Sequence, residues 1–295
     1  MSVDLGRPSV GALAGVVDTL GTWQVDGAPL QLHPGDVGWY STRGAEATAD
    51  ALRTWSRDGR LLALGLLDGP SLLRLAVAPE GVHDAELAEQ IAGDLADARL
   101  GVLPAGSASV EARGAGLLSA VLAAQGWRPG DLWTPFRRDL SAPVGELPVR
   151  VETIDADSAE VWAAIHWSAF RGTAPTADEV RRTGDRWRTM AAGPLSAQAR
   201  TVVALDRNGE PVAVATAWSA GRGRPGLLEP MGVHREHRGR GYGTAVSMAA
   251  AAVLRELGAS SAVVCAESSN AGAVATYAAA GFTAGPEVAD LERAG

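Results

Sequence analysis

The chain has 295 residues, a length typical of about two domains, and a hydrophobic content of 46%, as expected for a soluble globular protein. Its formal net charge of −8 argues against non-specific binding of nucleic acid and is compatible with a cationic amine as a small-molecule partner. The single cysteine, Cys265, excludes an intrachain disulfide, and because the chain contains no lysine, Schiff-base lysine chemistry is excluded as well.

The sequence shows no targeting or membrane segment. The N-terminal residues have no basic region followed by an apolar stretch, so no signal peptide is expected. Even the alanine-rich segment 245–257 contains Arg255 and is shorter than the ~20 residues that span a bilayer. We therefore expect a cytoplasmic protein that does not contact a membrane; whether it is a monomer or a homodimer stays open.

In the first half of the chain, apolar periodicity and turn residues predict alternating helices and strands. Helices are expected over 10–20, 45–56, 84–98 and 116–125, and strands over 61–67, 71–78, 107–111 and 134–140. The segment 141–148 is rich in proline and glycine, which is typical of a linker.

The second half predicts a similar series. Strands are expected over 149–154, 200–205, 212–218, 227–233 and 262–267, with a last strand beginning at Phe282. Helices are expected over 155–171, 176–190, 245–257 and 270–280. Thr176 and Glu179 have the spacing of a capping box, and Asp157 or Ser158 is expected to cap the first of these helices.

The two halves share one order of elements, repeated at a spacing of about 155 residues. Ala-Ala-Gln-Gly-Trp at 123–127 matches Ala-Ala-Ala-Gly-Phe at 278–282, and the strand end at 75–79 matches that at 231–235. This similarity predicts a tandem duplication with units at 1–142 and 147–295. A single larger α/β domain is the alternative.

A glycine turn stands between the strand at 227–233 and the helix at 245–257, in the segment Gly232-Val-His-Arg-Glu-His-Arg-Gly-Arg-Gly-Tyr-Gly-Thr244. A glycine turn that opens a helix directs several backbone N–H groups at one point near the positive end of the helix dipole, and such points bind phosphate. Its spacing does not fit the dinucleotide fingerprint G-x-G-x-x-G, and the lysine of a P-loop is missing. The alternative is a basic loop that only caps the helix.

The spacing Arg238-x-x-Gly241-x-Gly243 resembles the coenzyme A pyrophosphate turn of the GCN5-related N-acetyltransferase (GNAT) family, whose pattern is [Q/R]-x-x-G-x-[G/A]. The order of elements in the second half matches the fold of the same family. The resemblance implies an α/β (α+β) protein made of two tandem GNAT folds, each a central mixed, mostly antiparallel sheet flanked by helices. It also implies acetyl-CoA, or another short acyl-CoA, as the cofactor.

The resemblance places the coenzyme A site at the end of the 227–233 strand and along the glycine turn. Arg238 and Arg240 would add positive charge near the diphosphate and the 3′-phosphate. Backbone groups of Met231 and Val233 would meet the pantetheine and the thioester carbonyl. The residues expected to bind the cofactor are Met231, Gly232, Val233, Arg238, Gly239, Arg240, Gly241, Tyr242, Gly243, Thr244 and Asn270.

Asn270 and Tyr277 lie two helical turns apart, so both project from one face of the predicted helix. The segment resembles the family's N-x(6)-Y-x(3)-G-[F] helix, in which the asparagine contacts the cofactor arm and the tyrosine protonates the departing thiolate. A nearby hydroxyl donor favours a thiolate leaving group as its charge develops. The alternative is an ordinary half-buried tyrosine.

The first half has lost the residues that would carry this chemistry. Its residues at the positions of the arginine, the two glycines, the asparagine and the tyrosine are Val82, Ala85, Leu87, Ala115 and Leu122. Side chains at the glycine positions would crowd a pyrophosphate that approaches the backbone. We therefore expect one working cofactor site, in the second half, with the first half as a scaffold or a substrate wall.

Glu229 is an acid inside an apolar strand, a costly placement unless the side chain faces a polar cleft. In the resembling family a carboxylate near this place often accepts the amine proton, directly or through water, and a raised pKa would suit that role. The alternative is a structural carboxylate bonded to nearby backbone. Pro230 has no backbone donor and indicates an edge strand or a splayed one.

The first helix of the second half borders the acceptor cleft in the resembling family. The candidate substrate-binding residues are His166, Trp167 and Phe170 on this helix, together with Trp218. For each of them packing in the core is the alternative. His234 and His237 flank the glycine turn, but no metal site is expected, because zinc takes more ligands than these two.

Together these features predict an enzyme, an acyl-CoA-dependent N-acetyltransferase with Tyr277 and Glu229 as catalytic residues. It would move an acetyl or short acyl group to the primary amine of a small molecule. The alternatives are a non-catalytic acyl-CoA-binding protein and a dimerising or partner-binding scaffold. The segments 166–195 and 219–226 carry no motif that identifies the amine.

Overall fold

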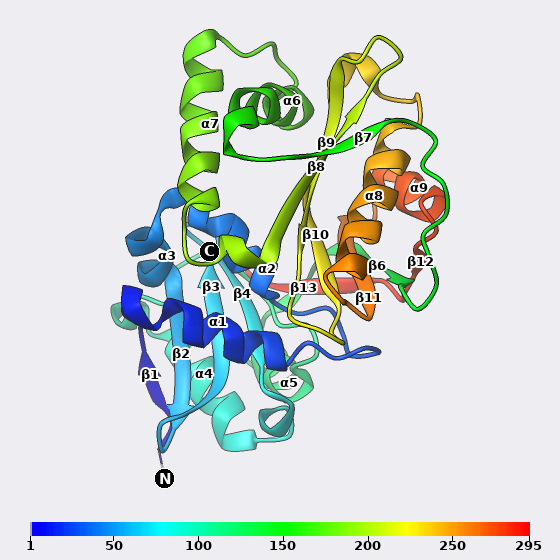
Figure 1. Ribbon diagram of the computed structural model, residues 1–295. Helices are drawn as coiled ribbons and strands as arrows, with labels where there is room; N and C mark the ends of the chain where they lie inside the picture. Colours follow the sequence, from blue (N-terminus) through cyan, green and yellow to red (C-terminus); the bar gives the residue numbers. More distant parts are fainter. Residues whose placement is uncertain (1) are drawn as a thin grey trace.

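The strands of both halves join into one 13-stranded sheet in the computed structural model, which describes residues 2–295 (Figure 1). The strand order is β1-β2-β3-β4-β5-β13-β6-β11-β10-β9-β8-β7, and β12 pairs with β6. The pairs β4·β5 and β10·β11 are parallel, and the other strand pairs of the described chain are antiparallel. Each half thus has a mixed, mostly antiparallel sheet, as predicted, and each contains one parallel pair.

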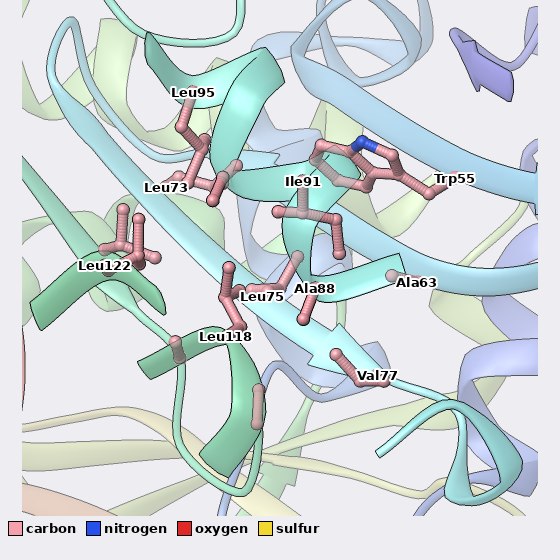
Figure 2. Close-up of a cluster of buried hydrophobic side chains, with 14 of the residues drawn as sticks. Trp55, Ala63, Leu73, Leu75, Val77, Ala88, Ile91, Leu95, Leu118 and Leu122 are labelled. Carbon is pink, nitrogen blue, oxygen red and sulfur yellow. The ribbon is translucent and has the colours of Figure 1, made fainter. Parts of the chain in front are cut away.

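The first half contributes strands β1 to β6 and helices α1 to α5. Their bounds are β1 (Asp4–Gly6), α1 (Leu13–Thr22), α2 (Pro34–Tyr40), α3 (Ala45–Ala51), β2 (Leu52–Arg57), β3 (Arg60–Leu67), β4 (Leu72–Val77), α4 (Ala85–Ala96), β5 (Ala108–Glu111), α5 (Gly116–Ala124) and β6 (Arg128–Asp139). Alternate strand residues face α4 and α5 on one side and α1 to α3 on the other, so both faces of this sheet are covered. Figure 2 shows the cluster under α4 and α5.

In this half one expected helix is wrong in part, and helix α2 was missed. The helix expected over 45–56 ends at Ala51, and the chain continues as β2, in which Leu52 and Trp55 are fully buried. Pairing with β1 and β3 outweighs the helical pattern, which shows tertiary contacts overriding local propensity. Helix α2 was not predicted, because it is short and contains the weak helix formers Gly35 and Gly38.

The second half contributes strands β7 to β13 and helices α6 to α9. Their bounds are β7 (Val151–Ile154), α6 (Ala159–Arg171), α7 (Ala177–Ala191), β8 (Ala199–Leu205), β9 (Pro211–Trp218), β10 (Gly226–Val233), α8 (Tyr242–Glu256), β11 (Ser261–Glu267), α9 (Ala271–Ala279), β12 (Thr283–Ala284) and β13 (Val288–Arg293). Helices α8 and α9 pack on one face of this sheet, and α6 and α7 pack on the other.

The caps of these helices agree in part with expectation. The capping box of Thr176 and Glu179 at the start of α7 is confirmed. The turn before α6 is capped by Asp155, whose carboxylate accepts from the N–H of Asp157, and not by Asp157 or Ser158. Ser158 holds the N-cap position of α6, as one of the two expectations had it, but its side chain makes no capping hydrogen bond. A short 3-10 turn (Ala156–Ser158) precedes the α-helix, and Asp155 caps that turn.

The last strand of each half joins the sheet of the other. Strand β6, from the first half, pairs with β11 over seven residues, from Asp139↔Ser261 to Trp133↔Glu267. Strand β13, from the end of the chain, lies between β5 and β6 and pairs with both. Backbone hydrogen bonds therefore cross the predicted boundary between the units 1–142 and 147–295. The division of the chain into these two units stays a prediction.

Among residues 2–295, no helix has both the length and the apolarity that a bilayer crossing requires.

Candidate active site

The glycine turn begins where β10 ends at Val233 and leads into α8 at Tyr242. Gly239 (φ 72°) and Gly241 (φ 85°) have left-handed backbone conformations, which favour glycine. Gly241 is the N-cap of α8, and no side chain of the described chain caps this helix. The backbone donors at the positive end of α8 are thus available to a ligand.

Strands β10 and β11 separate next to this turn. Only Gly226 and Leu227 pair with β11, and the register against β9 shifts between Leu228 and Met231. Pro230 lies in this shift and has no N–H to donate. Because β10 lies between β9 and β11, the prediction of a splayed strand is correct and that of an edge strand is wrong.

A groove of about 610 Å³ runs from the opening between the strands along the glycine turn to α9. The expected cofactor residues that line it are Met231, Gly232, Val233, Arg238, Gly239, Gly241, Tyr242, Gly243, Thr244 and Asn270. The remaining one, Arg240, lies over a neighbouring hollow of about 940 Å³ that the 206–209 turn also lines. Arg240 therefore lies outside the groove.

Two arginines of this segment hold the C-terminal end of α6 against the groove. The Arg238 guanidinium donates to the carbonyl of Ala169 at 2.6 Å, and the Arg235 guanidinium donates to the carbonyl of Gly172 at 2.7 Å. A cation at a helix C-terminus is stabilised by the free carbonyls and by the helix dipole. These bonds place Ala169 and Phe170 in the wall of the groove and leave positive charge beside the glycine turn.

Asn270 and Tyr277 lie at the two ends of α9. Asn270 is the exposed N-cap, and its side chain accepts from the N–H of Ala273 at 3.1 Å. Tyr277 is 6% exposed and packs against Phe136 and Phe282, with ring centroids 5.5 and 5.9 Å away. Burial, followed by the nearby charges of Glu229 and Cys265, raises the pKa of Tyr277, so its hydroxyl keeps its proton at neutral pH.

Glu229 lies on β10 at the opening between the strands. Its carboxylate is 3.7 Å from the guanidinium of Arg74, a residue of the first half, and its side chain retains 29% exposure. Burial raises the pKa of Glu229 well above its usual value, and the Asp36 carboxylate raises it further, while Arg74 lowers it. The remaining exposure limits this shift, but the charge of Glu229 depends on the first half of the chain.

The aromatic candidates for substrate binding lie in different surroundings. His166 stacks on Trp162 at 4.6 Å and packs against Trp39 and Phe170 at 5.4 and 4.7 Å. Burial, and then Arg171, lowers the pKa of His166 to about 4, so the ring is neutral at pH 7. Phe170 is 56% exposed and lines the groove beside the glycine turn, not a separate acceptor cleft.

Trp167 is half-buried, and its indole N–H donates to the Thr173 hydroxyl at 3.2 Å. Trp218 is 1% exposed and fills the space left by two glycines of α2: a Cβ at Gly35 would lie 2.6 Å from the Trp218 Cβ. The Trp218 indole donates to the carbonyl of Glu229 at 2.6 Å. The structure therefore places Trp218 in the core, where it supports the backbone of Glu229.

Sequence reasoning missed the residues of the first half that surround Glu229, chiefly Arg74 and Asp36. A signal was present in Leu72-Leu-Arg-Leu75, because a charge within an apolar strand needs a partner, the same argument that singled out Glu229. It also missed the α9 residues Ala273 and Thr276, which line the groove with small side chains. Within residues 2–295, no group of three or more His, Cys, Asp or Glu side chains is arranged to hold a metal ion.

The groove fits coenzyme A in shape and charge. It is large enough for an extended ligand, and phosphates would find uncapped helix donors and Arg238 at one end. The β10 backbone is open on the side of β11 beyond Leu227, so it can pair with an extended chain of amides such as pantetheine.

Comparisons with known proteins agree with this geometry. Residues 159–282 match the model of the acetyltransferase (GNAT) family. A mycothiol acetyltransferase from Thermobispora bispora is 30% identical over 274 residues, which cover 81% of this chain and 89% of that protein.

Two solved structures share the fold over nearly their whole length. A tandem GNAT protein from the clavulanic acid biosynthesis pathway has a TM-score of 0.63 and 17% identity, covering 99% of this chain and 98% of that one. An acetyltransferase of the GNAT family from Colwellia psychrerythraea has a TM-score of 0.60 and 14% identity, with the same coverage. The protein is therefore a member of the GNAT acetyltransferase family, built from two tandem GNAT folds.

Proposed function

We propose that the protein is an acetyl-CoA-dependent N-acetyltransferase that modifies the primary amine of a small molecule. The observation that carries this proposal is the groove at the start of α8, where an uncapped helix N-terminus, Arg238 and Asn270 meet next to the opening between β10 and β11. The turn from Gly239 to Thr244 would hold the phosphates. Met231 and Val233 would bind the pantetheine through their backbone groups.

Bound acetyl-CoA would supply an acetyl thioester at the opening between the strands. In the net reaction a C–N bond forms at the acetyl carbonyl carbon, the C–S bond breaks, and the ammonium loses two of its three protons, one to the base and one that ends on the thiol. Glu229, when ionised, would accept one proton from the ammonium, directly or through water, and so free the nitrogen lone pair. Tyr277 would donate its phenol proton to the departing thiolate and recover a proton released by the acylated nitrogen. The N–H of Val233 would donate to the carbonyl oxygen as its charge develops.

The pKa shifts of the two residues suit these roles. A buried tyrosine with a raised pKa stays protonated and can act as an acid, whereas a glutamate with a raised pKa has a higher affinity for the amine proton. Glu229 accepts a proton only in its ionised form, so kcat/KM should rise with pH as Glu229 ionises, with a midpoint above the usual range of a glutamate.

The test is release of free thiol from acetyl-CoA in the presence of different amines. The panel contains cysteinyl-sugar thiols, aminoglycosides, polyamines, amino acids and peptide N-termini, and the first class is placed first because of the mycothiol acetyltransferase relative. Tyr277→Phe and Glu229→Gln are the active-site variants, and Tyr40→Phe, a tyrosine of the first half, is the matched control.

Turnover with one class that is lost in Tyr277→Phe and kept in Tyr40→Phe supports the proposal and names the acceptor. Binding of acetyl-CoA without turnover on any amine contradicts it and favours a non-catalytic acyl-CoA-binding protein. Failure to bind acetyl-CoA favours a scaffold.

A further inference from the structure

The Glu229 carboxyl faces side chains from the first half of the chain. Arg74 of β4 lies 3.7 Å from it, and Asp36 of α2 and Asp68, between β3 and β4, are the other charged groups of that half that act on it. From its own half, Tyr277 of α9 is close enough for the charge of Glu229 to raise the pKa of the tyrosine. The residue proposed to accept the amine proton thus lies at the junction of the two halves.

Arg74 is the centre of a network of buried charges at this junction. Its guanidinium lies 2.9 Å from the Asp36 carboxylate and 3.3 Å from that of Glu111 on β5, and 3.7 Å from that of Asp68. Glu111 in turn pairs with Arg113 at 3.3 Å, and Arg113 pairs with Asp290 of β13 at 3.1 Å. These contacts fix Arg74, because its carboxylate partners lie on α2, on β5, on β10 and between β3 and β4.

Asp36 is held in place from a second direction. One carboxylate oxygen completes the capping box of α2 by accepting from the N–H of His33 at 2.6 Å, and the other faces Arg74. The side chain is 2% exposed and cannot turn to solvent without breaking the cap. Glu229 and Asp36 therefore face the same arginine, and the Asp36 carboxylate disfavours the ionised form of Glu229.

We propose that Asp36 and Arg74 are positioning residues that set the charge of Glu229, so that the acid–base chemistry of the second half is shared with the half that has lost its own cofactor turn. The proposal rests on the proposed function, in which Glu229 accepts the amine proton. The two residues act in opposite directions: the Asp36 carboxylate favours the protonated form of Glu229, and the Arg74 guanidinium favours the ionised form.

The experiment compares pH profiles of kcat/KM, with acetyl-CoA and the amine that gives turnover, for the wild type, Asp36→Asn and Arg74→Gln. Asp36→Asn keeps an oxygen for the α2 cap and removes the negative charge. The acid limb of the profile, in which kcat/KM rises with pH as Glu229 ionises, should therefore move to lower pH. Arg74→Gln removes the positive charge, so the limb should move to higher pH. Each shift should be about one pH unit, which is a tenfold change in rate on the limb.

Matched controls come from the surface of the same half. Asp97→Asn changes an exposed capping aspartate, and Arg60→Gln changes an exposed arginine paired with Glu80. Neither should move the limb. Arg74→Lys keeps the positive charge and should leave the limb at its wild-type position, and Asp36→Asn carries the test if Arg74→Gln does not fold. Shifts in the same direction for Asp36→Asn and Arg74→Gln, or rate losses without a shift, would overturn the proposal.

A second readout does not need turnover. Infrared difference spectra between the wild type and Glu229→Gln isolate the carbonyl stretch of the protonated Glu229 carboxyl, and its intensity against pH gives the titration midpoint. Opposite shifts of this midpoint in the two variants support the proposal even if no amine is acetylated, in which case only the proposed function fails. A midpoint that does not respond to either variant overturns the proposal even if turnover is found.

Discussion

The helices that follow β4 and β10 occupy matching places in the two halves and begin in opposite ways. In the first half, Asp84 caps α4: its carboxylate accepts from the N–H of Leu87 at 3.0 Å and pairs with Arg57 at 2.5 Å. In the second half, Gly241 begins α8 without a side-chain cap. The first half thus satisfies its helix N-terminus with its own carboxylate, while the second half leaves that position for an external anion.

The two halves also differ in the free space beside these helices, which is open at α8 and filled at α4. The groove beside α8 has a volume of about 610 Å³, whereas the corresponding space, between Val77, Leu87 and Leu118, is about 10 Å³. Figure 2 shows Val77, Ala88 and Leu118 directed into one cluster between β4, α4 and α5. The first half kept the fold and filled the groove with side chains, and its remaining contribution to the site is electrostatic, through Arg74 and Asp36.

The largest expected effects come from one matched position, Tyr277 in the second half and Leu122 in the first. Tyr277→Phe should lower kcat by about 10²- to 10⁴-fold, which is the usual contribution of a general acid, and should change stability little. Leu122→Ala should lower the free energy of unfolding by about 2–5 kcal/mol, because Leu122 is fully buried, and should leave kcat unchanged below the melting temperature.

Steady-state kinetics and urea unfolding of both variants check this pair. If Leu122→Ala lowered kcat as much as Tyr277→Phe does, the two positions would not differ in role, and the assignment of the acid to α9 would be wrong.

The next effect comes from giving α8 the type of cap that α4 has. Gly241→Asp should weaken acetyl-CoA binding about 30- to 100-fold, or roughly 2–3 kcal/mol, because a carboxylate would then lie where phosphate is expected to bind. Gly241→Asn is the matched control, since asparagine tolerates the left-handed conformation and carries no charge.

Isothermal titration with acetyl-CoA gives both affinity and stoichiometry. In the mirror experiment, Asp84→Asn in the first half should leave the stoichiometry at one, because the space beside α4 stays filled. If Asp84→Asn bound a second molecule of acetyl-CoA, the Asp84 cap, and not the filled space beside α4, would be what prevents binding in the first half.

A smaller effect concerns the packing of the halves against each other at His166, which touches Trp39 of the first half. The folded-state pKa of His166 is lowered to about 4, below the unfolded value of 6.5, so its contribution to stability is present above pH 6.5 and is lost as the pH falls towards 4. With partial exposure taken into account, the loss should be about 2 kcal/mol.

Unfolding free energies of the wild type and His166→Phe between pH 7 and 4 test this expectation. The variant should lose less stability over this range, whereas parallel curves would mean that His166 stays accessible to protons in the folded protein.

The smallest expected effect concerns α7 of the second half, whose capping box stabilises the helix and is not expected to bind acetyl-CoA. Thr176→Ala removes the capping box of α7 and should cost about 1 kcal/mol of stability without any change in acetyl-CoA affinity. Thermal unfolding and titration together check it, and a loss of affinity would mean that α7 takes part in the coenzyme site.

The sequence predicted the second half better than the first because its signals were local. Periodic strands, the glycine turn and the capping box of Thr176 and Glu179 depend on neighbouring residues, and the structure brings ten of the eleven expected cofactor residues to one groove. Strand β2 and helix α2 depend on contacts with β1, β3 and Trp218, which no local pattern contains. The position of Arg240 and the burial of Trp218 likewise follow from packing between distant segments.

The contacts of Arg74 between the two halves show most clearly what local sequence patterns cannot predict. The lone charge of Arg74 within an apolar strand indicated a partner, but not which one, because Asp36, Glu111 and Glu229 are brought to it by three different elements. Pairing between β6 and β11, or between β5 and β13, joins residues more than a hundred positions apart and leaves no periodic trace in either strand.

The placement of β13 between β5 and β6 also bears on how the protein is made. While the chain emerges from a ribosome, β5 has no neighbour on that side until residues 288–293 are synthesised, a delay on the order of 10 to 30 seconds at typical translation rates. During this time β5 and β6 expose hydrogen-bonding edges that attract other extended chains. Completion of the first half therefore waits for β13 of the second half, so the two halves should mature together.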